Sequence, residues 1–91
     1  MRRTLQLTQR ELEQFRDYLH HDEREEATIE AYLRAVERFG AWVDGRKITK
    51  ELALEWKAAL VAAGRRPVSV NAMLAAVNKF FVCMGREDCK V

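Results

Sequence analysis

Two adjacent arginines, Arg65 and Arg66, stand directly before an expected helix that begins near Pro67. The N-terminus of a helix has unpaired amide groups and a partial positive charge, so it attracts anions. Ser69 and Asn71 lie in the first turns of the same helix, where a hydroxyl and a carboxamide can contact phosphates and base edges. This spacing predicts a nucleic-acid contact. The alternative is that the two arginines form only a solvated turn before a helix.

The residue types needed for catalysis or metal binding do not form a recognisable site. His20 and His21 are adjacent, so on a helix their side chains point about 100° apart. Cys83 and Cys89 lack the spacing of a zinc site, and we expect Cys83 to be buried on a helix and Cys89 to be a free thiol. There is no glycine-rich phosphate loop and no nucleophile elbow. We therefore expect no catalytic residue, no cofactor and no metal.

The composition is that of one small soluble domain. The chain has 91 residues, of which 48% are hydrophobic and 33% are charged, and this length suits a single domain. No stretch approaches the roughly 18 apolar residues of a membrane span. The N-terminal residues lack the apolar core of a signal peptide, which favours a cytoplasmic protein with no membrane partner.

Charge is distributed unevenly along the chain. The net charge of +2 comes from 16 basic and 14 acidic side chains. Residues 1–26 hold five basic and seven acidic groups, a net charge of −2. Residues 47–91 hold eight basic and four acidic groups, a net charge of +4. The basic second half is where we expect an anionic partner to bind.

Glycines divide the chain into helical segments. Gly45, Gly64 and Gly85 each follow an amphipathic segment, as glycines that end helices do. Thr8 and Glu11 form the pattern of a capping box at the start of the first helix. We expect helices near residues 8–21, 26–44, 49–63 and 67–84 in one all-α bundle, with a fifth if the tail forms a turn. Gly40, inside the second, suggests a close crossing of two helices.

Apolar residues at steps of three and four mark the buried faces of these helices. In the second helix they are Ile29, Tyr32, Val36, Phe39 and Val43, and in the fourth they are Val70, Leu74, Val77, Phe80 and Phe81. We expect Trp42 and Trp56 in the core or at its edge. Leu33, Trp42 and Met73 are candidates for an exposed apolar patch.

The order of these residues is similar to that of a known domain. The pattern T-I-x-x-Y-x-x-x-V-x-x-F-x-x-W covers residues 28–42, and Ile48 and Thr49 open the next helix. It continues with Leu52, Trp56, Leu60, Gly64, the S-V-N of residues 69–71 and the L-x-x-V-x-x-F-F of residues 74–81. Over residues 8–85 the chain resembles the N-terminal core-binding domain of tyrosine recombinases, the phage integrase family, which has a SAM-like helical fold.

The resemblance implies a role in DNA integration and recombination. In the family this domain and a larger C-terminal catalytic domain clamp a DNA half-site. The catalytic domain carries the tyrosine nucleophile and the groups that stabilise the phosphate transition state, and this chain has no such set. We therefore expect the chain by itself not to cut DNA. The expected partners are double-stranded DNA, the catalytic domain of the same protein and other protomers on DNA.

In the family the second and fourth helices face the major groove. Carried onto this sequence, the expected DNA-binding residues are Thr28, Arg34, Arg38, Ser69, Asn71 and Lys79, with Arg65 and Arg66 leading into the fourth helix. Three alanines, Ala31, Ala72 and Ala75, lie on the same faces. The sequence departs from the family at Glu25, where many relatives have serine, and at Leu33, Ala72 and Met73, where many have arginine.

The alternative function is a helical protein–protein interaction module that does not bind nucleic acid. SAM-like bundles serve both roles, because a fold does not determine a function. An exposed apolar patch would favour this alternative.

Overall fold

The computed structural model describes residues 7–22 and 25–91, and every regular element in these ranges is helical. The elements are α1 (Gln9–Asp22), α2 (Glu26–Val43), α3 (Lys50–Ala62), α4 (Pro67–Cys83) and a short 3-10 helix, η1 (Glu87–Cys89). The predicted all-α class with four main helices is confirmed. No helix in the described ranges is both long and apolar enough to cross a bilayer.

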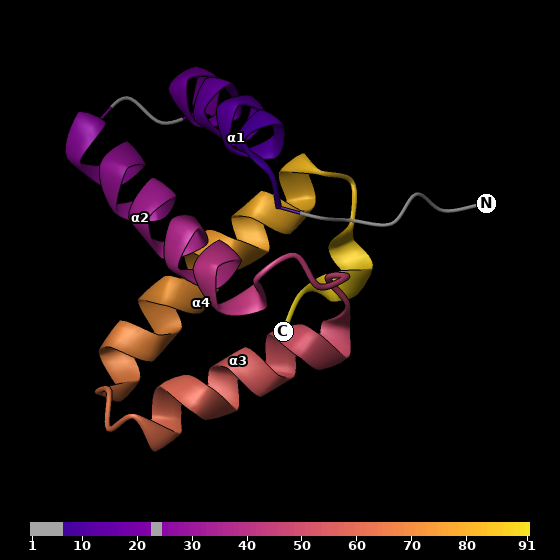
Figure 1. The fold of residues 1–91 in the computed structure, drawn as a ribbon. Coiled ribbons are helices and arrows are strands. Elements are labelled where there is room, and N and C mark those ends of the chain that lie inside the picture. The colour runs from indigo at the N-terminus through magenta and orange to yellow at the C-terminus, as the bar shows by residue number, and fades with distance from the viewer. Residues whose placement is uncertain (1–6, 23–24) are drawn as a thin grey trace.

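Helix α4 lies at the centre of the molecule. It packs against α1, α2, α3 and η1, and it runs from the end of α3 to a position beside α1 (Figure 1). Four fully buried phenylalanines, Phe15, Phe39, Phe80 and Phe81, fill the space between the helices. The Phe39 ring lies 4.9 Å from the Trp56 ring and 6.0 Å from the Phe81 ring, measured between centroids. These contacts fix α2 relative to α3 and α4.

Side chains determine where α1 and α3 begin. The Glu11 carboxylate accepts the Thr8 backbone N–H at 3.1 Å, as the predicted capping box requires. The Thr8 hydroxyl, however, donates to the same carboxylate and caps no amide, so only half of the predicted box forms. At α3 the Thr49 hydroxyl accepts the Leu52 N–H at 3.1 Å, which is an ordinary N-cap.

The turn after α3 has the backbone geometry that the sequence predicts. Gly64 has a φ of +82°. Its N–H donates to the Val61 carbonyl at 3.0 Å, and the Arg65 N–H donates to the Leu60 carbonyl at 3.3 Å. These two bonds form a Schellman motif, in which glycine takes the left-handed position at little steric cost. The turn fixes the backbone of Arg65 directly before α4.

The prediction of a helix crossing at Gly40 is wrong. A Cβ atom at Gly40 would overlap the side chain of Leu7, which precedes α1. Leu7 is half-buried and packs against the core. Glycine in the middle of α2 therefore makes room for Leu7, in the chain segment that enters α1.

Cys83 is less buried than predicted, while the prediction that Cys89 is not in a disulfide is confirmed. Cys89 is fully buried, whereas Cys83 on α4 is half-buried, and no disulfide joins them. The reason is that η1 folds back onto α3 and α4 and carries Cys89 into the core. Asn78 holds this tail, since its carboxamide donates to the Val91 carbonyl at 2.9 Å and accepts the Val91 N–H at 3.0 Å.

The predicted apolar patch does not form. Leu33 is a core residue, because it lies on the same face of α2 as Ile29 and Val36. Trp42 and Met73 are half-buried. The large apolar side chains that are exposed in the described residues are Leu54, Val61, Val68 and Val82.

Candidate nucleic-acid interface

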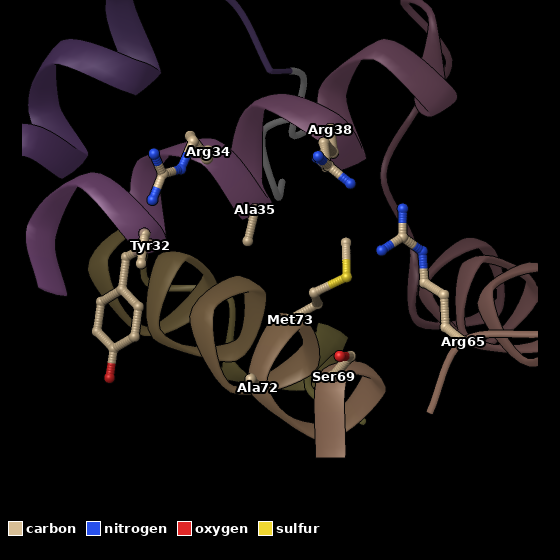
Figure 2. Close-up of a pocket in the computed structure, with 9 residues that line it drawn as sticks. Tyr32, Arg34, Ala35, Arg38, Arg65, Ser69, Ala72 and Met73 are labelled. Atoms are coloured by element: carbon tan, nitrogen blue, oxygen red, sulfur yellow. The ribbon is translucent and has the colours of Figure 1, made fainter. Parts of the chain in front are cut away.

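A groove of about 310 Å³ lies between α2, the α3–α4 connection and α4 (Figure 2). Its lining consists of Ala31, Tyr32, Arg34, Ala35, Arg38, Arg65, Ser69, Ala72 and Met73. Three of these nine residues are arginines and none is acidic. The groove therefore offers positive charge between two helices that are far apart in the sequence.

Helix α2 contributes two of the arginines because of their spacing. Arg34 and Arg38 are four residues apart, so they lie on one side of the helix together with Ala31. Both arginines are exposed. Glu30 and Glu37 are also exposed, but they do not line the groove. Glu30 and Glu37 lie one turn from Arg34 on the exposed surface of α2, but the side chains that line the groove toward α4 are those of Arg34 and Arg38.

The third arginine, Arg65, comes from the α3–α4 connection. Its guanidinium and that of Arg38 point toward one another across the groove, and the Met73 side chain projects from α4 beside them (Figure 2). Arg66 is the N-cap residue of α4, Pro67 follows at the first helical position, and no side chain caps this end. Ser69, in the first turn, lines the groove. The partial positive charge of the α4 N-terminus therefore adds to that of the arginines.

Among the residues that the structure describes, the arginines at this site have no acidic partner. Arg34, Arg38, Arg65 and Arg66 form no ion pair or side-chain hydrogen bond with any residue that the structure describes. Guanidinium groups present a planar set of donors that suits the oxygens of a phosphate. The groove can therefore bind an anion without first breaking a contact within the described chain.

Two other arginines of the same domain, Arg46 and Arg86, form contacts within it. Arg46 donates to the carbonyls of Trp42 and Val43, each at 2.8 Å, and its guanidinium lies 4.5 Å from the Trp42 ring centroid. It thereby satisfies the last carbonyls of α2. Arg86 pairs with Asp88 at 3.1 Å, and this hydrogen bond raises the pKa of Arg86. The three-dimensional contacts separate structural arginines from those open to a ligand.

The remaining predicted site residues lie outside the groove lining. Asn71 is exposed on α4, and Thr28 is half-buried in the first turn of α2. Lys79 lies on α4, and its ammonium contacts Asp22 at the end of α1, with 2.6 Å between Nζ and Oδ2. Glu25 occupies the N-cap of α2 but forms no side-chain cap bond. The structure thus brings together Arg34, Arg38, Arg65 and Ser69 from the predicted set.

Sequence reasoning missed three residues of the groove. Tyr32, Ala35 and Met73 line it, although the sequence suggested a core role for Tyr32 and gave Met73 only as an apolar-patch candidate and as a position where many relatives have arginine. The available signal was helical spacing, since Ala35 is one turn from Ala31 and Met73 is one turn from Ser69. In residues 7–22 and 25–91, no group of three His, Cys, Asp or Glu side chains could hold a metal ion.

Comparison with protein families identifies the domain. Residues 12–88 match the model of the phage integrase N-terminal SAM-like domain. The chain belongs to this family. The matched range of this integrase domain includes α2, α3 and α4 completely, and with them every residue that lines the groove. No curated protein and no solved structure gives a significant match to the chain.

Proposed function

We propose that this integrase domain binds double-stranded DNA at a recombination half-site, with the groove between α2 and α4 against the phosphate backbone. The observation that carries the proposal is the convergence of Arg34, Arg38 and Arg65 on one groove that no acidic residue among those described lines. Phosphate contacts supply most of the affinity and orient a protein on a duplex. Ala31 and Ala72 allow the backbone to come close, because their side chains are small.

Within this proposal α4 reads sequence. Ser69 borders the groove, and Asn71 is exposed on a different side of the same helix. Hydroxyl and carboxamide groups can bond base edges in the major groove. Arg66 adds a phosphate contact at the helix N-terminus. Thr28 marks the other end of the contact surface on α2, where the Glu25 carboxylate weakens the approach of a phosphate.

The same proposal implies further partners. Membership of the integrase family supports a catalytic domain in the same protein and other protomers as neighbours on DNA. The catalytic domain would close the clamp around the half-site that this domain approaches from one side. Affinity of the isolated domain is therefore expected to be weak and to depend strongly on salt.

A fluorescence anisotropy titration of a labelled half-site duplex, at about 50 mM and about 200 mM salt, tests the proposal. The triple variant Arg34→Ala, Arg38→Ala, Arg65→Ala should lose most of the affinity, and its salt dependence should flatten by about 0.9 in log–log slope for each lost phosphate contact. The matched control is Lys47→Ala, Lys50→Ala, Lys57→Ala, which removes the same charge from exposed positions outside the groove. Equal losses for the two triple variants would argue against a specific role of the groove.

The role of Asn71 needs a separate comparison of two duplexes. Asn71→Ala should weaken binding to the half-site by about 1–3 kcal/mol and leave binding to random DNA nearly unchanged. Arg66→Ala should instead weaken both by similar factors, because a phosphate contact carries no sequence information. An equal loss on both duplexes for Asn71→Ala would remove this residue from the reading surface.

A second candidate function is a protein-binding module without DNA contact. The observation in its favour is an outward apolar stripe on α3, where Leu54, Ala58 and Val61 are exposed at steps of four and three. This stripe lies on the side of α3 opposite to the buried Trp56 and Leu60. Absence of salt-dependent DNA binding in the titration above would favour this candidate.

A further inference from the structure

The ion pair between Lys79 and Asp22 joins parts of the chain that are distant in the sequence. Asp22 is the last residue of α1, and Lys79 lies near the end of α4. The Lys79 ammonium lies 2.6 Å from the Asp22 carboxylate and 5.8 Å from the centroid of the Tyr32 ring of α2. One side chain therefore contacts groups of α1 and α2 from its position on α4.

The position of Asp22 at the end of α1 indicates that its carboxylate is there to pair with Lys79. A carboxylate at the C-terminal end of a helix opposes the helix dipole, so Asp22 is unfavourable for α1 by itself. The Lys79 cation offsets that cost. The Lys79 side chain keeps only 25% of its surface exposed, whereas the groove arginines are exposed and have no acidic partner among the described residues.

Tyr32 connects this ion pair with the groove. Its ring faces the Lys79 ammonium, and the same residue lines the groove. In Figure 2, Tyr32 lies at the end of the groove opposite Arg65. Any displacement of Lys79 therefore changes the packing at that end, between α2 and α4.

We infer that Asp22, Lys79 and Tyr32 form a latch that positions α2 against α4, and that Lys79 acts as a positioning residue and not as a phosphate contact. The inference rests on the proposed DNA-binding function of the groove. It reassigns a lysine that the family resemblance places on the DNA. The latch affects DNA binding because it sets the distance between the groove arginines. Arg34 and Arg38 lie on α2, and Arg65 directly precedes α4.

The variant Asp22→Asn separates the latch from simple electrostatics. This change makes the domain more positive by one charge, so long-range attraction alone would tighten DNA binding. The latch predicts the opposite, a loss of roughly two- to fivefold, which is the size of one exposed ion pair. Asp17→Asn is the matched control, because Asp17 is an exposed carboxylate of α1 that has no ion pair within the described residues.

Charge reversal tests the role of Lys79 directly. Lys79→Asp should weaken DNA binding, and the double variant Asp22→Lys with Lys79→Asp should recover most of the loss while its net charge equals that of the wild type. Lys79→Met should leave the log–log salt slope unchanged, whereas loss of a phosphate contact would lower the slope by about 0.9. All titrations are performed well below the midpoint of thermal unfolding of the weakest variant, so a purely structural loss of stability would not alter them.

Three results would overturn the latch: tighter binding of Asp22→Asn than of Asp17→Asn, no recovery in the double variant, or a reduced salt slope in Lys79→Met. If the wild type itself binds no DNA, the proposed function fails separately. The latch is then tested without DNA by nuclear magnetic resonance of the Tyr32 ring. The ring signals should shift in Asp22→Asn and return toward their wild-type positions in the double variant, and unchanged signals would contradict the latch.

Discussion

Individual cationic side chains of this domain differ in what their charges do. Arg46 donates hydrogen bonds to the last carbonyls of α2, and its guanidinium lies over the Trp42 ring. Arg38 and Arg65, in contrast, form no ion pair with an acidic group among the described residues. An exposed cation without a partner keeps its full attraction for an anion, while one that is already hydrogen-bonded must first lose those bonds. Residue type therefore does not by itself identify a binding residue; its local contacts do.

The two thiols provide a prediction at the residue scale. Burial raises the pKa of the Cys83 thiol, so less of it is thiolate at a given pH, and the thiolate is the reactive form. We expect Cys83 to react with Ellman's reagent more slowly than an unstructured cysteine at pH 8, and faster as the pH rises. Cys89 is fully buried and should react only when the domain unfolds. The change in absorbance gives the reaction rate of each thiol, and the protein unfolded in guanidinium chloride serves as the reference. Rapid reaction of both thiols in the native state would contradict this prediction.

Gly40 and Leu7 provide a second prediction. Alanine is favoured over glycine inside a helix by about 1 kcal/mol, but a Cβ at Gly40 would overlap the Leu7 side chain. Gly40→Ala should therefore stabilise the domain more in a Leu7→Ala background than in the wild type. Urea unfolding of the wild type, the two single variants and the double variant measures the coupling free energy between the two positions. Additive effects of the two substitutions would show that Leu7 does not need the glycine.

At the scale of elements, the ends of helices help to position the site. Helices α3 and α4 both end in Schellman motifs, with Gly64 and Gly85 in the left-handed conformation. The first motif determines the direction in which the chain leaves α3, and with it the position of Arg65 and the start of α4. The groove depends on that turn as much as on the faces of α2 and α4, because one of its three guanidiniums comes from the connection.

Substitution of Gly64 tests this dependence. An added Cβ would meet no atom within 4 Å, so the effect comes from the φ of +82°. A residue with a Cβ pays about 1–2 kcal/mol in the left-handed region, and we expect Gly64→Ala to lower the free energy of unfolding by about 1 kcal/mol. Thermal unfolding measures the loss. Gly64→Asn, which tolerates this conformation better, should lose less, and equal losses for the two would indicate another cause.

At the scale of the whole molecule, one core holds all the elements together. The buried residues form a single cluster to which every helix contributes, and Phe39 lies at its centre in ring contact with Trp42, Trp56 and Phe81. A domain of this size should unfold in one cooperative step. Its geometry at the groove then depends on core packing that no groove residue supplies.

Removal of the Phe39 ring tests the single core. Phe39→Ala should lower the free energy of unfolding by about 3–5 kcal/mol, a large part of the roughly 5–14 kcal/mol available to a domain of this size. For the wild type, far-ultraviolet circular dichroism and the fluorescence of Trp42 and Trp56 should report the same urea midpoint of unfolding. Two separated midpoints in the wild type would show that part of the bundle folds independently.

The sequence predicted the helices well and the site only in part. Local patterns carry the information for a helix, and Gly64 or Thr49 shows where one ends or begins. Arg65 and Ser69 could be selected because they lie beside a helix N-terminus. Arg34 and Arg38 came only from the family resemblance, because nothing in their own helix shows which partner its polar face meets. The burial of Cys89 could not be predicted from the sequence, because it depends on how η1 packs against α3 and α4.

The sequence by itself determined the all-α class, the helix boundaries and the basic character of the second half, because helical periodicity, capping residues and charge are local properties. Only the tertiary structure decided which cations converge. Arg38 and Arg65 are 27 positions apart in the sequence, and they share a groove because packing between α2 and α4 brings their elements together. The same packing engages Lys79 with Asp22, a contact that depends on three helices and leaves no local pattern in the sequence.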